Sequence, residues 1–245
     1  MQRLMSKAVN HPYKVLNVQY RMHPEISLFP NNTFYKGDLL DSESVINRPS
    51  PAQVLKNHGK KTKWIEKYLF IDVSESAEER EKGENGSFRN VKEAESICEV
   101  ICKCLLTSDS MPPISIVVLS FYSAQVRYIQ KEFQKLGISS ISFCSVQVMT
   151  VDSFQGSEAD IVLISFVRSN SENTVGFLKD FQRLNVALTR AKHMLLLLGS
   201  SKTMEHCGVS TLKDLIVDAR ARGRLINFPV SVSRSATPYR CVTWK

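Results

Sequence analysis

The sequence predicts an α/β protein with a mainly parallel sheet covered by helices on both faces. Two observations carry this prediction: short continuous apolar runs recur along the chain, and amphipathic stretches separate most of them. Strands buried on both faces need such runs, and parallel strands need crossover connections, usually helices. With 245 residues, of which 43% are hydrophobic and 23% charged, the chain can bury a full core.

Five apolar runs mark the expected strands. They are residues 69–73, 114–119, 146–151, 161–166 and 194–198. Continuous runs of this length are typical of strands that are buried on both faces. When such strands alternate with helices, the crossovers are right-handed and ligands gather beyond the carboxyl ends of the strands.

Three segments between or after these runs have the apolar spacing of helices: residues 91–106, 124–136 and 211–222. The first is preceded by Asn90, with Glu93 three positions later, which is the spacing of a helix cap. The second and third are followed by Gly137 and Gly223. Because glycine readily adopts the left-handed conformation found at helix ends, we expect these two helices to end there.

Three segments lack a clear period. Residues 41–67 contain two prolines and five lysines, so we expect a surface insertion there. Residues 75–87 are acidic and contain an Asn-Gly pair, which indicates a mobile turn rather than a site. Residues 229–245 form a tail without a strong pattern.

The composition narrows the classes of protein to consider. The net charge of +8 favours a polyanionic partner, although the excess is modest. Six cysteines occur without a Cys-x-x-Cys pair, so no zinc site is expected, and we predict no metal-ligating residues in this chain. There is no signal-like segment and no apolar run of membrane-spanning length, so we expect reduced thiols in a cytoplasmic or nuclear protein without membrane contact.

One run, residues 180–192, combines helical apolar spacing with two arginines seven positions apart, Arg183 and Arg190. On a helix they would share a stripe and lie about 10.5 Å apart along the axis. A guanidinium is always charged, and its rigid fork of donors matches phosphate oxygens. Taken alone, such a pair is also typical of a solvated surface or of ion pairs, so the run needs support from other motifs.

Four motifs, taken in order, supply that support. They read VQYRMHP at 18–24, LSFYSAQ at 119–125, TVDSFQGSE at 150–158 and DFQRLNVALTRAK at 180–192. SFVRSN follows the third motif at 165–170, and GFL precedes the fourth at 176–178. Together they resemble the second, C-terminal RecA-like domain of superfamily 1 helicases of the up-frameshift and senataxin-like family, over roughly residues 15–199.

The resemblance implies a RecA-like fold and the use of ATP with Mg²⁺, bound between two RecA-like domains. The phosphates and the metal are then held mainly by the first domain. The 245 residues contain no Gly-x-x-x-x-Gly-Lys-Ser/Thr loop and no Walker B pair, so only the second domain is expected here. Residues 1–14 are then a linker from the first domain, residues 15–228 the second domain with the insertion at 41–67, and residues 229–245 a tail.

The resemblance also assigns roles around the nucleotide. Arg190 is the arginine finger, which meets the charge that develops on the transferred phosphoryl group, and Arg21 contacts the γ-phosphate. Gly156, Glu158 and Arg183 complete the nucleotide set. Glycine allows the backbone to approach a ligand closely, and a carboxylate accepts from ribose hydroxyls. The alternatives are a plain turn for Gly156 and a solvated loop carboxylate for Glu158.

Nucleic acid is expected to lie across the sheet tops and to be held through phosphate and sugar rather than base edges. The resemblance points to Thr150, Val151, Ser120 and Tyr122 as contacts. Tyr122 is open to two interpretations, stacking on a base or packing in the core. Arg168 is likewise open between a structural ion pair and a ligand contact.

We therefore predict the C-terminal motor domain of an ATP-dependent RNA or RNA/DNA helicase, inactive by itself. Its partners are single-stranded RNA or DNA and the first RecA-like domain of the same protein. The alternative is a non-catalytic RNA- or protein-binding module that retains the helicase fold, against which the intact motif arginines argue. A stand-alone nucleotidase is disfavoured because the sequence has no glycine loop that could cradle phosphates.

Overall fold

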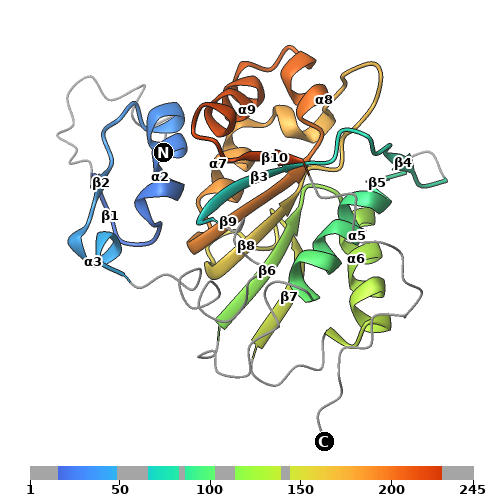
Figure 1. Cartoon of the computed structure of the whole chain (residues 1–245), viewed down its shortest axis with the longest axis horizontal. Helices are drawn as coiled ribbons and strands as arrows, with labels where there is room; N and C mark the ends of the chain where they lie inside the picture. The colour runs from blue at the N-terminus through green and yellow to red at the C-terminus, as the bar shows by residue number, and fades with distance from the viewer. Residues whose placement is uncertain (1–15, 49–65, 83–85, 103–113, 139–143, 228–245) are drawn as a thin grey trace, which may run out of the picture.

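A six-stranded parallel sheet forms the centre of the molecule (Figure 1). The computed structural model describes residues 16–48, 66–82, 86–102, 114–138 and 144–227. The strands, in the order β10-β3-β9-β8-β6-β7, are β3 (Tyr68–Asp72), β6 (Ile114–Ser120), β7 (Cys144–Thr150), β8 (Ala159–Ser165), β9 (Ala191–Gly199) and β10 (Leu225–Asn227). Because every pairing in this sheet is parallel, each strand is reached by a crossover connection.

Helices cover both faces of this sheet (Figure 1). One face carries α5 (Val91–Val100) and α6 (Ser123–Lys135), and the other carries α2 (Pro24–Phe34), α7 (Phe181–Leu188), α8 (Ser201–His206) and α9 (Ser210–Ala221). Alternate residues of each strand serve the two layers: in β9, Leu196 and Leu198 pack with α5 and α6, whereas Leu195 and Leu197 pack with the opposite helices. The predicted α/β class with a doubly covered parallel sheet is confirmed.

Shorter elements lie around this core. They are β1 (Val18–Gln19) paired in parallel with β2 (Leu40–Asp41), α3 (Glu43–Ile46), the antiparallel β4 (Glu79–Arg80) and β5 (Phe88–Arg89), and the 3-10 turn η3 (Gly176–Lys179). His23 caps α2, since its Nδ1 accepts from the backbone N–H of Glu25 at 3.1 Å. The backbone N–H of His23 donates to the carbonyl of Lys192 at 3.0 Å, which fastens the turn before α2 to the start of β9.

The sequence predicts the long elements and misses short or interrupted ones. All five expected strands are present, while the edge strand β10 and the helix α2 are unexpected. A proline inside α2, Pro30, obscures its helical pattern. The expected helix ends are confirmed, because Asn90 caps α5 by accepting from the N–H of Glu93 at 3.1 Å and because Gly137 and Gly223 adopt positive φ angles of 67° and 63°.

Several expectations fall on residues outside the described ranges. These are the linker 1–14, most of the insertion 41–67, the end of the helix predicted at 91–106, and the tail 229–245. The described parts of the acidic segment 75–87 contain β4 and lead into β5. None of the helices in the described residues has both the length and the apolar character needed to cross a bilayer.

A buried polar cluster joins α5 and α6 to the carboxyl end of β8. Glu93 is fully buried, and its carboxyl group accepts from the Ser165 hydroxyl at 2.5 Å and from the Val167 backbone N–H at 2.9 Å. Gln125 donates to the Ser165 hydroxyl oxygen at 3.0 Å. Val167 has a φ of 72°, a left-handed conformation that is strained for a β-branched residue. Glu93 therefore holds the strained backbone where the chain leaves β8.

Stability should fall as the pH rises from about 5 to above 8, because burial raises the pKa of Glu93 from 4.5 to about 8. Between these two pKa values the folded protein keeps a proton on Glu93 that the unfolded chain has lost. The stability that depends on protonated Glu93 is complete below pH 4.5 and is lost as the pH rises through the folded pKa. The effect is at most about 5 kcal/mol.

Glu93→Gln removes the titrating group at nearly constant size. Urea unfolding at about pH 5 and pH 8.5 should give a smaller difference in the free energy of unfolding for this variant than for the wild-type protein. Equal differences for the two proteins would show that Glu93 does not titrate in this window.

Candidate functional site

Arg21 is held in a tight turn between β1 and α2. The side-chain oxygen of Gln19 accepts from the backbone N–H groups of Arg21 and Met22, at 2.9 and 2.8 Å. The guanidinium of Arg21 donates through Nε to Glu158 Oε2 at 2.6 Å and through Nη1 to the carbonyl of Thr189 at 3.1 Å. The turn thus directs Arg21 toward the segments that precede β8 and β9.

Arg190 stands where α7 has ended and β9 is about to begin. Its guanidinium donates to three neutral oxygens: the carbonyl of Val186 at 2.8 Å, the carbonyl of Ser157 at 3.1 Å and the hydroxyl of Thr189 at 3.1 Å. Among the described residues, no carboxylate lies within ion-pair distance of it. Burial, and then the nearby charge of Arg21, lower the pKa of Arg190. Arg190 is therefore a partly buried cation without a paired anion.

Glu158 is the carboxylate of this cluster. Its two oxygens meet Arg21 at 2.6 Å and Lys192 at 3.1 Å, and the hydrogen bond from Arg21 is the main cause that lowers the pKa of Glu158. One carboxylate thus pairs with two cations, Arg21 and Lys192, while Arg190 lies near enough to be influenced by its charge. Arg48 lies nearby and donates to the backbone carbonyl of Arg21 at 3.3 Å. The site has an excess of positive charge that suits a polyanion.

This cluster lies at the amino ends of the strands, so the expectation that ligand residues gather beyond the carboxyl ends does not hold for it. Glu158 directly precedes β8, and Arg190 and Lys192 flank the start of β9. The physical reason lies in the connections. The segment 151–158 crosses the sheet from the carboxyl end of β7 to the amino end of β8, and α7 runs back to the amino end of β9.

The predicted stripe of Arg183 and Arg190 on one helix is wrong. The helix α7 ends at Leu188 with Thr189 as its C-cap, because β9 must begin at Ala191. Arg183 stays at the other end of α7, where its Nε lies 3.1 Å from Asp152 Oδ1. The structure therefore does not bring Arg183 to the cluster around Arg190.

Gly156 lies two residues before Glu158 in the crossing segment. Its φ of 88° is readily adopted only by glycine, and a Cβ built there would meet no atom within 4 Å. Glycine is thus required by the backbone conformation and not by crowding inside the protein. The open space beside it leaves the backbone accessible.

Three of the four predicted nucleic-acid contacts are buried. Ser120, Tyr122 and Val151 are 0%, 2% and 2% exposed, and the hydroxyl of Ser120 donates to the carbonyl of Ser165 at 3.1 Å. For Tyr122 the structure shows the packing alternative. Thr150 is partly exposed at the carboxyl end of β7, where its hydroxyl lies 2.7 Å from that of Ser153.

Arg168 forms a structural ion pair. Its Nε lies 2.9 Å from Glu78 Oε2, and the two side chains are only 7% and 11% exposed. The same oxygen of Glu78 also accepts from the backbone N–H of Ser169 at 2.8 Å and from the Asn170 amide at 2.9 Å. These bonds join the turn after β8 to the segment before β4.

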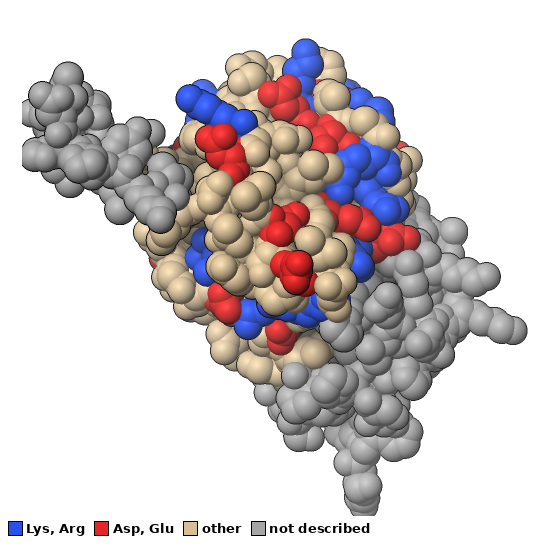
Figure 2. All heavy atoms as spheres, turned by 90° about the vertical axis from the view of Figure 1, so that its left-hand side faces the viewer, with Lys and Arg blue, Asp and Glu red and all other residues tan. Residues whose placement is uncertain are grey.

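The side of the molecule that carries α2, β1, β2 and α3 has mixed charge. Figure 2 shows Lys and Arg interspersed with Asp and Glu and separated by uncharged residues, without a broad described patch of one sign. The positive excess around Arg190 is therefore local. It comes from a few side chains placed by the fold rather than from a generally basic face.

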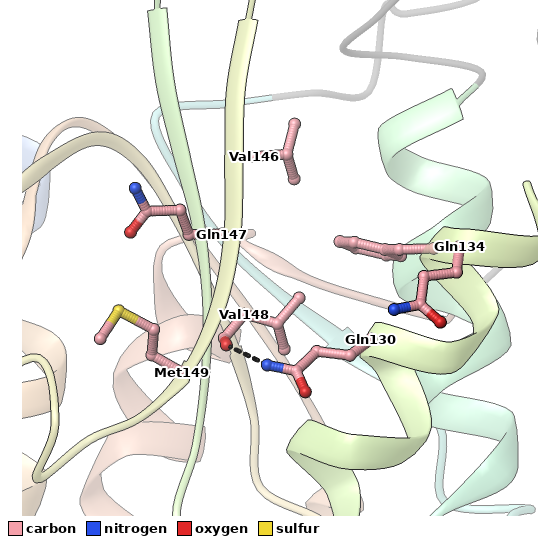
Figure 3. Close-up of a pocket in the computed structure, with 7 residues that line it drawn as sticks. Gln130, Gln134, Val146, Gln147, Val148 and Met149 are labelled. Atoms are coloured by element: carbon pink, nitrogen blue, oxygen red, sulfur yellow. Dashed lines mark hydrogen bonds between the residues drawn. The ribbon is translucent and has the colours of Figure 1, made fainter. Parts of the chain in front are cut away.

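A shallow groove lies elsewhere, between α6 and the edge strand β7 (Figure 3). Its volume is about 400 Å³, and it is lined by Gln130, Phe133, Gln134, Val146, Gln147, Val148 and Met149. Gln130 donates to the carbonyl of Val148 at 3.0 Å. None of the predicted site residues lines this groove, so it is separate from the charged cluster.

Comparison with known proteins gives the family. A family model described as an AAA domain matches residues 1–202. The chain belongs to this AAA-domain family. Regulator of nonsense transcripts 1 from Dictyostelium discoideum is 39% identical over 204 residues, 83% of this chain and 14% of that protein. The probable helicase senataxin from Homo sapiens is 37% identical over 240 residues, 91% of this chain and 8% of that protein.

Other relatives of this AAA-domain protein agree. The probable helicase MAGATAMA 3 from Arabidopsis thaliana is 33% identical over 216 residues, 88% of this chain and 25% of that protein. These matches confirm the resemblance to superfamily 1 helicases, although the chain spans only 8% to 25% of the length of the three relatives named here. Among solved structures, the C-terminal domain of a possible DNA helicase from Lactobacillus plantarum aligns with a TM-score of 0.39 at 14% identity, over 74% of this chain and 88% of that chain.

Sequence reasoning misses three residues that build the site of this AAA-domain protein. Lys192 binds Glu158, Gln19 shapes the turn of Arg21, and Arg48 donates to the backbone of that turn. Lys192 and Gln19 lie inside motifs quoted above, so their positions were available signals. Arg48 lies in a segment without a pattern, and only the fold brings it to Arg21.

Two glutamates should differ in their effect on stability. Glu78→Ala should lower the free energy of unfolding by roughly 3 kcal/mol or more, since it leaves the buried charge of Arg168 unpaired. Glu158→Ala should change it by less than about 1 kcal/mol, because Glu158 and its partner Arg21 are 41% and 31% exposed. Urea unfolding of the two variants measures both values. Equal losses would contradict the distinction between a structural and a solvent-exposed ion pair.

Proposed function

We propose that this chain is the C-terminal motor domain of an ATP-dependent RNA or RNA/DNA helicase, with Arg190 as the arginine finger and Arg21 as a second cation. The observation that carries the proposal is the unpaired charge of Arg190, whose donors meet only neutral oxygens in the described structure. A partly buried cation beside a second cation gains most from an arriving anion. The γ-phosphate of ATP is an anion of the required kind.

The chemistry of the donor set fits a triphosphate. Arg21, Arg190 and Lys192 offer fixed cationic donors, and Glu158 keeps Arg21 oriented while its oxygens retain acceptor capacity for ribose hydroxyls. ATP supplies the phosphoryl group that is transferred. In the described residues no group of three or more His, Cys, Asp or Glu is placed to hold a metal ion. In the proposal, Mg²⁺ is held mainly by a first RecA-like domain of the same protein.

In this proposal, nucleic acid binds at the carboxyl ends of the strands, opposite the charged cluster. The relatives are named as helicases or as a regulator of nonsense transcripts, which supports single-stranded RNA or DNA as the substrate track. Thr150, partly exposed at the carboxyl end of β7, is the hydroxyl best placed to contact phosphate.

Arg190→Ala should lower nucleic-acid-stimulated ATP hydrolysis by about 10³-fold or more in a protein that also contains the first RecA-like domain. The reason is the loss of a cation that stabilises charge in the transition state. Arg190→Lys should recover little, because an ammonium does not reproduce the guanidinium fork.

The matched control is Arg127→Ala. Arg127 lies on α6, is 57% exposed and pairs with Glu81, so its loss should leave the rate unchanged. A rate for Arg190→Ala equal to that of the control would refute the finger assignment.

A further inference from the structure

Three aromatic rings meet at the carboxyl end of β6. The ring centroid of Tyr122 lies 5.8 Å from that of Phe88 and 5.5 Å from that of Phe177. Tyr122 is 2% exposed, whereas Phe177 is 56% exposed. Of these three rings, that of Phe177 is therefore the most exposed. Phe177 lies in the GFL motif, to which the helicase proposal gives no role.

Phe177 is held on a firm support. The preceding residue, Gly176, has a φ of 49°, and a Cβ at that position would lie 2.5 Å from Arg168 Nη1 and 2.7 Å from the Tyr122 hydroxyl. Only glycine allows η3 to pack this closely on the buried Arg168 and Tyr122. The following residue, Leu178, is 1% exposed and anchors the turn in the core. Phe177 is exposed at a fixed position rather than on a free loop.

A cation lies over this exposed ring. The guanidinium carbon of Arg183 lies 5.6 Å from the ring centroid of Phe177, and the Arg183 side chain is 37% exposed. Asp152, which follows Thr150 by two positions, and Asp180 hold Arg183 through contacts of 3.1 and 3.7 Å. The ring and the guanidinium are thus linked to the carboxyl end of β7, where the hydroxyls of Thr150 and Ser153 lie.

We propose that Phe177 and Arg183 form a stacking platform for one base of a single-stranded nucleic acid. Phe177 packs against the face of the base, and Arg183 contacts the neighbouring phosphate. An exposed, rigidly backed ring in cation–π contact with a guanidinium offers both kinds of contact at once. Every base has a π face, so the platform reads no sequence. This inference rests on the proposed function, because it requires a strand at the carboxyl ends of the sheet.

The test uses the 245-residue protein and a single-stranded RNA of about 12 nucleotides that carries one 2-aminopurine. Phe177→Leu keeps an apolar side chain but removes the ring, so it should weaken binding by about tenfold and abolish the quenching of 2-aminopurine fluorescence. Phe177→Tyr keeps the ring and should retain both.

The matched control is Phe181→Leu. Phe181 is 47% exposed on α7, but its ring packs edge-on against Phe34 with the centroids 4.6 Å apart. Its substitution should leave affinity and quenching unchanged. Equal losses for Phe177→Leu and Phe181→Leu would overturn the platform, because they would indicate a general effect of the surface.

Salt dependence separates the two parts of the platform. Arg183→Gln should reduce the slope of log affinity against log salt by about 0.7 to 1, whereas Phe177→Leu should leave that slope unchanged because stacking releases no counterions. If the wild-type chain binds and Phe177→Leu binds equally well, the platform is refuted while the helicase proposal stands, and Phe177 is assigned to a protein contact. If the wild-type chain does not bind RNA, both the platform and the proposed track at this end are refuted.

Discussion

The parallel register of β8 and β9 is the constraint on which the charged cluster depends. Ala159 pairs with Ala191, and the N–H of Ala159 donates to the carbonyl of Arg190 at 3.1 Å. Glu158 and Arg190, which directly precede these paired residues, must therefore lie side by side. The hydrogen bond from His23 to the carbonyl of Lys192 then brings the turn of Arg21 to the same place. A slip of one residue in this ladder would disperse the cluster, since neighbouring side chains in a strand point to opposite faces.

Two partly or fully buried arginines of this fold differ in charge balance. Arg168 is buried, but Glu78 neutralises it and its donors also meet Thr174 and Tyr122. Its position therefore contributes to structure. Arg190 has three hydrogen bonds to neutral oxygens but no described carboxylate within ion-pair distance, so its orientation is fixed while its charge is not neutralised. Fixing a charge without pairing it is the preorganisation that electrostatic catalysis requires.

Local patterns predict the core of this fold and its helix ends because they depend on residues that are close in sequence. The runs of β6, β8 and β9 are apolar throughout, since both faces of these strands are covered. The candidate site residues come from motifs, but their grouping depends on contacts that periodicity does not contain. The stop of α7 at Leu188 is set by the start of β9, and this separates Arg183 from Arg190.

The burial of Tyr122 has a similar long-range cause, because Phe88 and Phe177 cover it from distant parts of the sequence. The carboxyl and amino ends of the strands are likewise connected through contacts between residues that are far apart in the sequence. One connection is the crossing segment, which leads from Thr150 to Glu158. The other is α7, whose eight residues span about 12 Å in the direction from Arg183 toward Arg190. Asp152 joins Arg183 at one end, and the carbonyl of Ser157 accepts from Arg190 at the other. The two connections are therefore bonded to each other near both ends of the sheet.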